Sequence, residues 1–64
     1  MEVFIERENK AVHVKGVSTG KALLKKLKIT PTTVILVREN EVILAEEKLG
    51  TGDRIKILSV VSGG

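Results

Sequence analysis

The sequence contains no cysteine, tryptophan or tyrosine, and it has one phenylalanine, one proline and one histidine among 64 residues. The absence of cysteine excludes disulfides, thiolate metal ligands and a cysteine nucleophile, which fits a cytoplasmic protein. His13, the single histidine, has no set of partners for a metal, so we expect it at the surface of a short strand. Because so short a chain offers little for nucleophilic catalysis, we expect that it is not an enzyme by itself.

Long hydrophobic runs are also missing. The longest, such as Val34 to Val37, are far below the ~20 residues of a membrane-spanning helix, and the N-terminus lacks a signal-peptide pattern. We therefore expect a soluble cytoplasmic protein without a membrane partner. Lys and Arg outnumber Asp and Glu by 11 to 8, a mild excess that favours an acidic partner without demanding nucleic acid.

The residues that are present suffice for one small domain. Hydrophobic residues make up 42% of the chain and charged residues 30%, a composition that is typical of a folded domain and not of a disordered chain. Alternating apolar residues predict two strands, 2–6 and 11–14, with polar residues between them. Asn9 is the expected turn residue, because Asn tolerates the left-handed backbone of a tight hairpin.

A second hairpin and a last strand are predicted in the other half of the chain. Residues 33–38 and 41–45 are rich in Val, Ile and Leu, and they flank the polar turn Glu39-Asn40. A loop containing Gly50 and Gly52 then leads into a strand over residues 54–61.

A single helix is predicted between the hairpins, from Thr19 to Leu27. Ser18 or Thr19 is the expected cap, apolar residues follow at three- and four-residue spacing, and lysines occupy the solvent side. Such a short helix requires packing against a sheet. We expect Thr30-Pro31 to end it, because Pro disfavours a helical conformation in the preceding residue.

The predicted order of elements gives an α+β fold in which one helix covers one face of a small sheet. The strand over Val34 to Val37 is apolar at consecutive positions, as expected where both faces avoid water. One set of its side chains therefore either lies on an exposed apolar patch, joined by Phe4, Leu58 and Val60, or is buried by curling of the sheet or by self-association. An exposed patch of this kind marks a partner surface.

Two glycine-containing loops were tested as phosphate sites. The loop from Gly16 to Lys21 has three residues between its glycines instead of four, and Ala22 stands where a P-loop has Ser or Thr. The loop from Gly50 to Gly52 lacks the third glycine and the helix of a dinucleotide site. We interpret both as connections.

Lysines gather in and before the predicted helix, and their default interpretation is a solvated face. They are Lys15, Lys21, Lys25, Lys26 and Lys28. Single-strand binders add aromatic stacking platforms, and this chain has only Phe4, so nucleic acid is not the expected partner. An RNA-binding β-grasp module, by analogy with the TGS domain, remains as an alternative.

The chain ends with Ser62-Gly63-Gly64 directly after the last strand. Two glycines in succession predict a thin tail that can enter a narrow active site. With this element order, the ending resembles the ThiS/MoaD family of ubiquitin-like β-grasp proteins, including the archaeal small modifier proteins. The resemblance rests on the first strand Val3-Phe4-Ile5, the segments 22–27 and 34–37, and above all the segment 49–64.

The resemblance implies a β-grasp domain over residues 1–61, with a mixed sheet of about five strands and one main helix, and a flexible tail over 62–64. It implies that a ThiF/MoeB-like enzyme adenylates the carboxylate of Gly64 with ATP and magnesium, and that the adenylate becomes a thiocarboxylate. The chain itself would bind no cofactor and would be a monomer when free. The activating enzyme would dock on residues that include the following: Phe4, Leu58, Val60, Val61 and Ser62.

The resemblance leaves the recipient open. The sulfur would pass to a thiazole synthase subunit in thiamin biosynthesis or to a molybdopterin synthase subunit in molybdenum cofactor biosynthesis. Alternatively, it would be used to make a thiolated tRNA. The same carboxyl passed to lysines would make the chain a ubiquitin-like modifier. Bacterial members often carry Asn-Gly in the second hairpin and a later Pro-Arg segment; here Glu41 follows Asn40 and residues 45–48 replace that segment, which argues against a specifically thiamin-related role.

Overall fold

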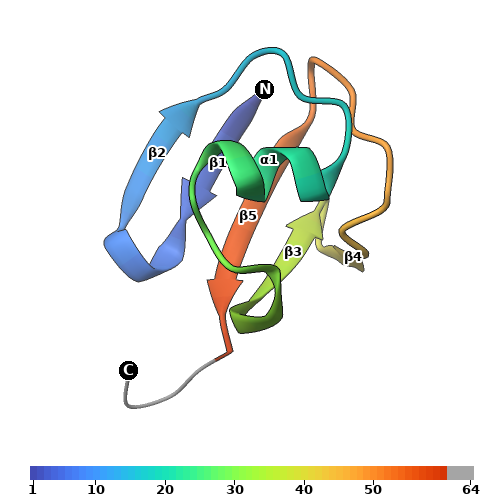
Figure 1. Ribbon diagram of the computed structural model, residues 1–64. Coiled ribbons are helices and arrows are strands. Elements are labelled where there is room, and N and C mark those ends of the chain that lie inside the picture. The colour runs from blue at the N-terminus through green and yellow to red at the C-terminus, as the bar shows by residue number, and fades with distance from the viewer. Residues whose placement is uncertain (61–64) are drawn as a thin grey trace.

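The computed structural model describes residues 1–60 of the chain (Figure 1). The strands form one sheet in the order β2-β1-β5-β3-β4; β1 and β5 run parallel, and the other neighbouring pairs are antiparallel. This is the predicted ubiquitin-like β-grasp fold, with a mixed five-stranded sheet and one α-helix within the described residues. The elements are β1 (Glu2–Ile5), the 3-10 helix η1 (Glu6–Glu8), β2 (Lys10–His13), α1 (Gly20–Lys26), the 3-10 helix η2 (Pro31–Thr33), β3 (Val34–Arg38), β4 (Glu41–Ile43) and β5 (Arg54–Ser59).

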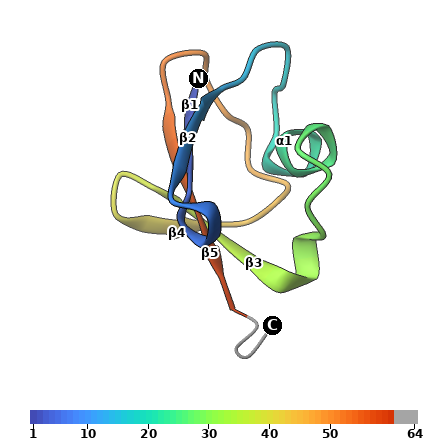
Figure 2. The ribbon, with the colours of Figure 1, turned by 90° about the vertical axis from the view of Figure 1, so that its left-hand side faces the viewer.

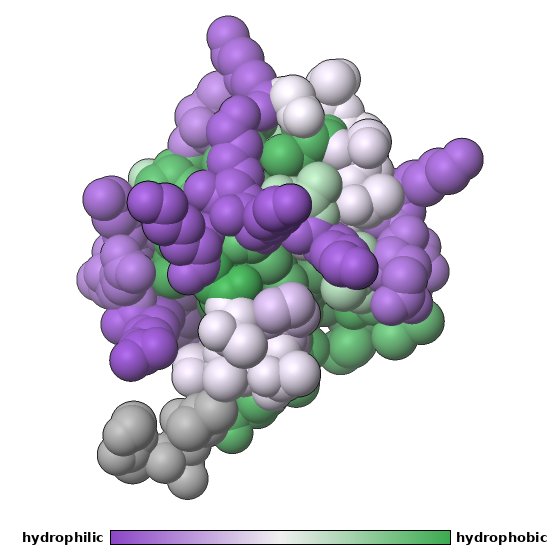
Figure 3. Space-filling view, viewed as in Figure 1, coloured by the Kyte–Doolittle hydropathy of each residue, from purple (hydrophilic) through white to green (hydrophobic). Residues whose placement is uncertain are grey.

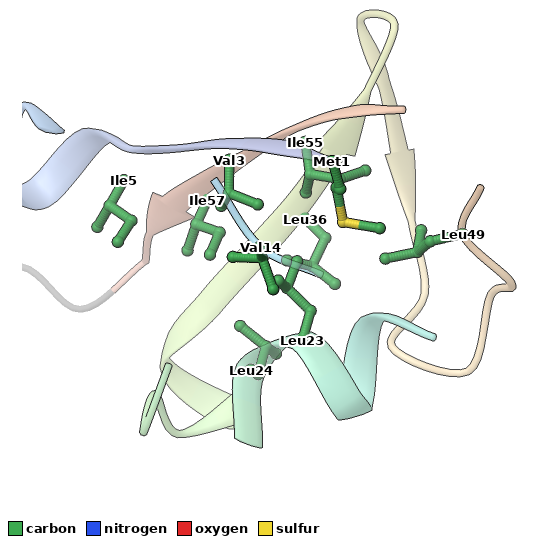
Figure 4. Close-up of a cluster of buried hydrophobic side chains, with 10 residues drawn as sticks. All are labelled: Met1, Val3, Ile5, Val14, Leu23, Leu24, Leu36, Leu49, Ile55 and Ile57. Atoms are coloured by element: carbon green, nitrogen blue, oxygen red, sulfur yellow. The ribbon is translucent and has the colours of Figure 1, made fainter. Parts of the chain in front are cut away.

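The hydrophobic core lies between the sheet and α1, which covers one face only (Figure 2). Every second residue of β1 and β5 points into it, and Leu23 and Leu24 enter it from the helix (Figure 4). Full burial of one such aliphatic side chain contributes about 1.5–3 kcal/mol, so these contacts dominate the stability. The buried set is Met1, Val3, Ile5, Val14, Leu23, Leu24, Leu36, Leu49, Ile55 and Ile57.

The helix α1 has seven residues and depends on its surroundings for stability. Thr19 caps it, since its side-chain oxygen accepts a hydrogen bond from the N–H of Ala22 at 3.1 Å. The N–H of Lys21 donates to the carbonyl of Ala45, so the loop before β5 also holds the first turn. No helix within residues 1–60 is long and apolar enough to cross a membrane.

The helix ends close to the predicted Leu27, which is its C-cap, but Thr30-Pro31 is not what ends it. Lys28 takes the left-handed conformation with φ 60°, and the N–H groups of Ile29 and Lys28 donate to the carbonyls of Leu24 and Lys25 at 2.9 and 3.1 Å. These two bonds form a Schellman motif, which ends the helix before Pro31 begins η2. The usual sequence signal is a glycine at the left-handed position, and here that position is Lys28.

The first hairpin confirms Asn9 as the turn residue, with φ 50° and ψ 46°. Its first strand ends at Ile5, earlier than predicted, because Glu6 begins η1. In the second hairpin Glu39 and Asn40 both have positive φ, 53° and 66°, as a type I′ turn requires.

Other strand ends also differ from the prediction: β2 spans residues 10–13 instead of 11–14, and β3 begins at Val34 instead of Thr33. β4 stops at Ile43 instead of Ala45, because the carbonyl of Ala45 accepts the N–H of Lys21 rather than joining the sheet. β5 ends at Ser59, and the predicted end at Val61 lies outside the described residues.

Candidate functional site

The centre of the sheet leads into the predicted reactive tail. β5 is paired with β1 from Arg54 to Ile57 and with β3 from Ile55 to Ser59, so the strand is held from both edges and β3 alone continues to its C-terminal end. Beyond the strand, the N–H of Val60 donates to the carbonyl of Thr33 at 3.0 Å. The predicted site residues after this point lie outside the described residues, and their roles stay predictions: Val61, Ser62, Gly63 and Gly64.

Apolar side chains gather on the sheet face that α1 leaves uncovered. Phe4 is opposite Lys56 in the register of β1 and β5, and Val37 is opposite Lys56 on the other side and opposite Val42 in β4. Ile35 and Leu58 form the next pair in the same face. We call these residues the outer apolar surface: Phe4, Ile35, Val37, Val42 and Leu58.

The outer apolar surface is accessible to a partner. The side chain of Val42 is 69% exposed, and Phe4 and Leu58 are partly exposed. The sheet therefore does not curl enough to bury these side chains, and solvent reaches them. Of the two interpretations that the sequence left open, the single chain favours the exposed patch, which is typical of a protein-binding surface.

Two positively charged side chains lie on the same sheet face as the outer apolar surface. Arg54 and Lys56 are exposed on β5, and they share their orientation with Leu58 because the three alternate along the strand. His13 on the edge strand β2 is exposed, as predicted, and is opposite Glu2. A partner surface with an apolar centre and an acidic rim would match this arrangement.

Two of the predicted docking residues, Phe4 and Leu58, come together on the outer apolar surface, and Val60 lies just beyond the end of β5 with 49% exposure. Sequence reasoning left open which half of β3 faces outward, and it did not include Val42. Residues 42–45 are consecutively apolar, so the sequence gives no signal for the face of Val42, and only the register with β3 shows which face it takes.

The loop from Gly50 to Asp53 is a turn, as predicted. The carboxylate of Asp53 accepts the N–H of Gly50 at 2.7 Å and lies 3.5 Å from the guanidinium of Arg38. The backbone donor that a phosphate would use at Gly50 is thus taken by a side chain of the same loop. Likewise, the connection before α1 is held by Thr19 as a helix cap.

The chain was also compared with families of known proteins. The model of the ThiS family matches residues 3–64, which is nearly the whole sequence. The chain belongs to the ThiS family. It is similar to the sulfur carrier protein TtuB of Thermus thermophilus, with 37% identity over 57 residues that cover 89% of this chain and 88% of that protein.

Membership of the ThiS family confirms the resemblance inferred from the sequence and supports a role as a sulfur carrier. The range of the ThiS family match includes the last glycines as well as the folded domain. For this chain, the geometry adds a central strand that leads to the tail and an apolar surface on the uncovered face of the same strand.

Proposed function

We propose that the chain is a sulfur carrier that works through the carboxylate of Gly64. A ThiF/MoeB-like enzyme adenylates this carboxylate with ATP and magnesium, and the adenylate is then converted into a thiocarboxylate. The ThiS family match that extends to Gly64 is the observation that carries the proposal. The chain acts as a substrate of other enzymes and not as a catalyst.

The chemistry explains why a carrier needs this activation. A carboxylate is a poor electrophile, so its oxygen first attacks the α-phosphorus of ATP and pyrophosphate leaves. Hydrosulfide then attacks the acyl carbon of the adenylate, and AMP leaves with the oxygen that carried it. The product is a nucleophilic thiocarboxylate at neutral pH. The phosphate and magnesium sites belong to the activating enzyme.

We place the activating enzyme on the outer apolar surface. Leu58 in this surface is separated from Val60 by one residue, so an enzyme bound here lies beside the origin of the tail. Each residue of extended chain adds at most about 3.3–3.6 Å, so any four residues span at most roughly 13–14 Å. Docking on the sheet and insertion of Gly64 into the enzyme are compatible over this length.

The thiocarboxylate delivers its sulfur to a second enzyme, such as a thiazole or molybdopterin synthase subunit or an enzyme that thiolates tRNA. If the activated carboxyl is instead passed to lysines, diglycine-linked lysines accumulate in the cell, and a proteomic search for them distinguishes conjugation from sulfur transfer.

Intact-mass spectrometry tests the carrier proposal. The purified chain is incubated with ATP, magnesium, the cognate activating enzyme and a sulfur source. We expect the mass of an adenylate and then of one oxygen-to-sulfur exchange, both lost when Gly64 is deleted. Absence of both products from the unaltered chain would contradict the proposal.

A pair of glycine substitutions provides the matched control. Gly63→Ala adds a methyl group to the tail, and we expect adenylation to fall by about tenfold or more, because small misplacements in an active site are costly. Gly52→Ala makes the same change where an added Cβ meets nothing within 4 Å, so adenylation should stay unchanged. Equal rates for the two variants would argue against a narrow site for the tail.

A further inference from the structure

The charges of this chain are strongly separated along its sequence. Residues 9–38 contain six lysines and Arg38 but no aspartate or glutamate, and all eight acidic residues lie in the rest of the chain. The net charge of the chain is only +3, because the positive charge of this basic segment is largely balanced by the acidic residues on either side of it in the sequence. α1 lies in the middle of the basic segment, and acidic residues reach only its two ends: the N–H of Gly20 donates to the carbonyl of Glu47, and Lys28 lines a pocket together with Glu6 and Glu8.

The basic side chains form a surface on the side of α1 that faces away from the sheet. Lys21 and Lys25 are four residues apart and share a helical face, and Lys28 follows at the end of the helix. Lys26 turns toward the preceding loop, where its Nζ donates to the carbonyl of Lys15 at 2.6 Å. The view from the helix side shows hydrophilic side chains projecting over this region (Figure 3). We call the five residues the lysine face: Lys15, Lys21, Lys25, Lys26 and Lys28.

No lysine of the lysine face forms an ion pair with an acidic residue of the described chain. Within residues 1–60 the two ion pairs both involve Arg38, with Glu47 and with Asp53, and neither includes a lysine. All five residues of the lysine face are exposed. Their charges therefore act on solvent and on an approaching anion.

From this cluster of exposed lysines without ion pairs we infer that the lysine face binds the phosphate backbone of structured RNA. Lysine is depleted at protein–protein interfaces but supplies point charges to phosphates, so a group of exposed lysines fits a polyphosphate better than an acidic protein. With Phe4 on the opposite face, the lysine face has no aromatic ring for base stacking. The contact is then one of charge and shape, without base recognition.

The position of the lysine face allows RNA and protein to bind together. The outer apolar surface lies on the uncovered side of the sheet, and α1 lies on the other side (Figure 2). A protein docked on the sheet therefore leaves the lysines free. The inference does not rest on the sulfur-carrier proposal, since RNA binding requires neither ATP nor Gly64.

Fluorescence anisotropy with a labelled RNA hairpin tests the inference, with the free chain titrated over a series of salt concentrations. The double variant Lys25→Gln/Lys28→Gln is compared with Arg54→Gln/Lys56→Gln, which removes the same charge from the opposite face. We expect the first to weaken binding by about tenfold or more and to lower the salt slope by roughly 1.4–1.8, for two lost phosphate contacts. The second should leave the slope nearly unchanged.

Three results would overturn the inference. One is an equal loss of affinity in both double variants, which would show attraction by net charge alone. Another is the absence of salt-dependent binding by the unaltered chain. The third is tighter binding of a polyglutamate peptide than of the hairpin, which would indicate an acidic protein partner.

An NMR titration locates the contact independently of the substitutions. On addition of the same hairpin, amide signals of residues 20–28 should shift, while those of Ile35, Val37 and Val42 should not. Shifts confined to the sheet would contradict the inference. Deletion of Gly63 and Gly64 should leave the shifts in place, so a failure of the RNA inference and a failure of the carrier proposal are distinguishable.

Discussion

Gly20, the first residue of α1, has no room for a side chain. A Cβ built on it would lie 2.5 Å from Cδ1 of Leu36 and 3.1 Å from the carbonyl oxygen of Ala45, so this glycine sets how closely the helix approaches β3 and the loop after β4. Sequence reasoning interpreted the loop from Gly16 to Lys21 as a connection, which is correct, but it did not predict this contact. The contact involves residues 16 and 25 positions away, and no local pattern indicates it.

The Gly20→Ala substitution tests this packing. Alanine favours a helix by up to about 1 kcal/mol over glycine, but overpacking a core costs typically 1–3 kcal/mol. We expect the second effect to dominate, with a net loss of about 1–2 kcal/mol in the free energy of unfolding, measured by urea denaturation. Gly52→Ala, in open space, is the control. A Gly20→Ala variant as stable as the unaltered chain would show that α1 shifts without cost.

The turn between β3 and β4 stores backbone strain. Glu39 has φ 53°, and for a residue with a Cβ the left-handed conformation costs roughly 1–2 kcal/mol. Asn40, at φ 66°, tolerates this conformation better. The hairpin therefore forms because its strands pair and pack, and not because Glu39 favours the turn.

Replacing the turn by Asn-Gly should release this strain. The double variant Glu39→Asn/Asn40→Gly supplies the residues that type I′ turns prefer, and we expect it to raise the free energy of unfolding by about 0.5–1.5 kcal/mol. Thermal and urea denaturation measure the gain. The same change should leave adenylation untouched, because the turn lies outside the outer apolar surface. Loss of stability would show that the side chain of Glu39 has a role beyond the turn.

The sequence predicted every strand and the helix, because each has a local signal. Alternation marks β1, β2 and β5, and the Thr19 cap with its three- and four-residue apolar spacing marks α1. The stop at Lys28 escaped prediction because it depends on a lysine in a conformation typical of glycine. The end of β4 escaped because it depends on a contact with Lys21, which lies far away in the sequence.

The whole molecule presents two chemically distinct faces, and Val42 tests the apolar one. Val42→Asp changes an exposed residue, so we expect less than about 0.5 kcal/mol of destabilisation. For the activating enzyme we expect KM to rise by about tenfold or more with kcat unchanged, because docking is weakened and the chemistry is not. Thr32→Asp adds the same charge on exposed η2 and should have normal kinetics. Normal kinetics in the Val42 variant would exclude this surface as the docking site.

The candidate site was predictable only in part, because its surface depends on how the strands align with one another in the whole sheet. Phe4 and Leu58 were identified from the predicted strands, but Val42 required the register of β3 and β4, which pattern alone does not define. Gly63 and Gly64 were predicted to be the reactive residues from the family resemblance, and the ThiS match extends over them. Their chemistry remains a prediction for the mass-spectrometric test.

The parallel pairing of β1 with β5 has a mechanical consequence. An enzyme that holds the tail pulls on β5 along its length, while β1 and β3 hold that strand at both edges through bonds that run across the direction of pull. Such bonds are loaded together and do not open one after another as in an unzipping hairpin. The strand that leads to the tail is thus the one best placed to withstand force, and the domain should stay folded while its last residues are drawn into another protein.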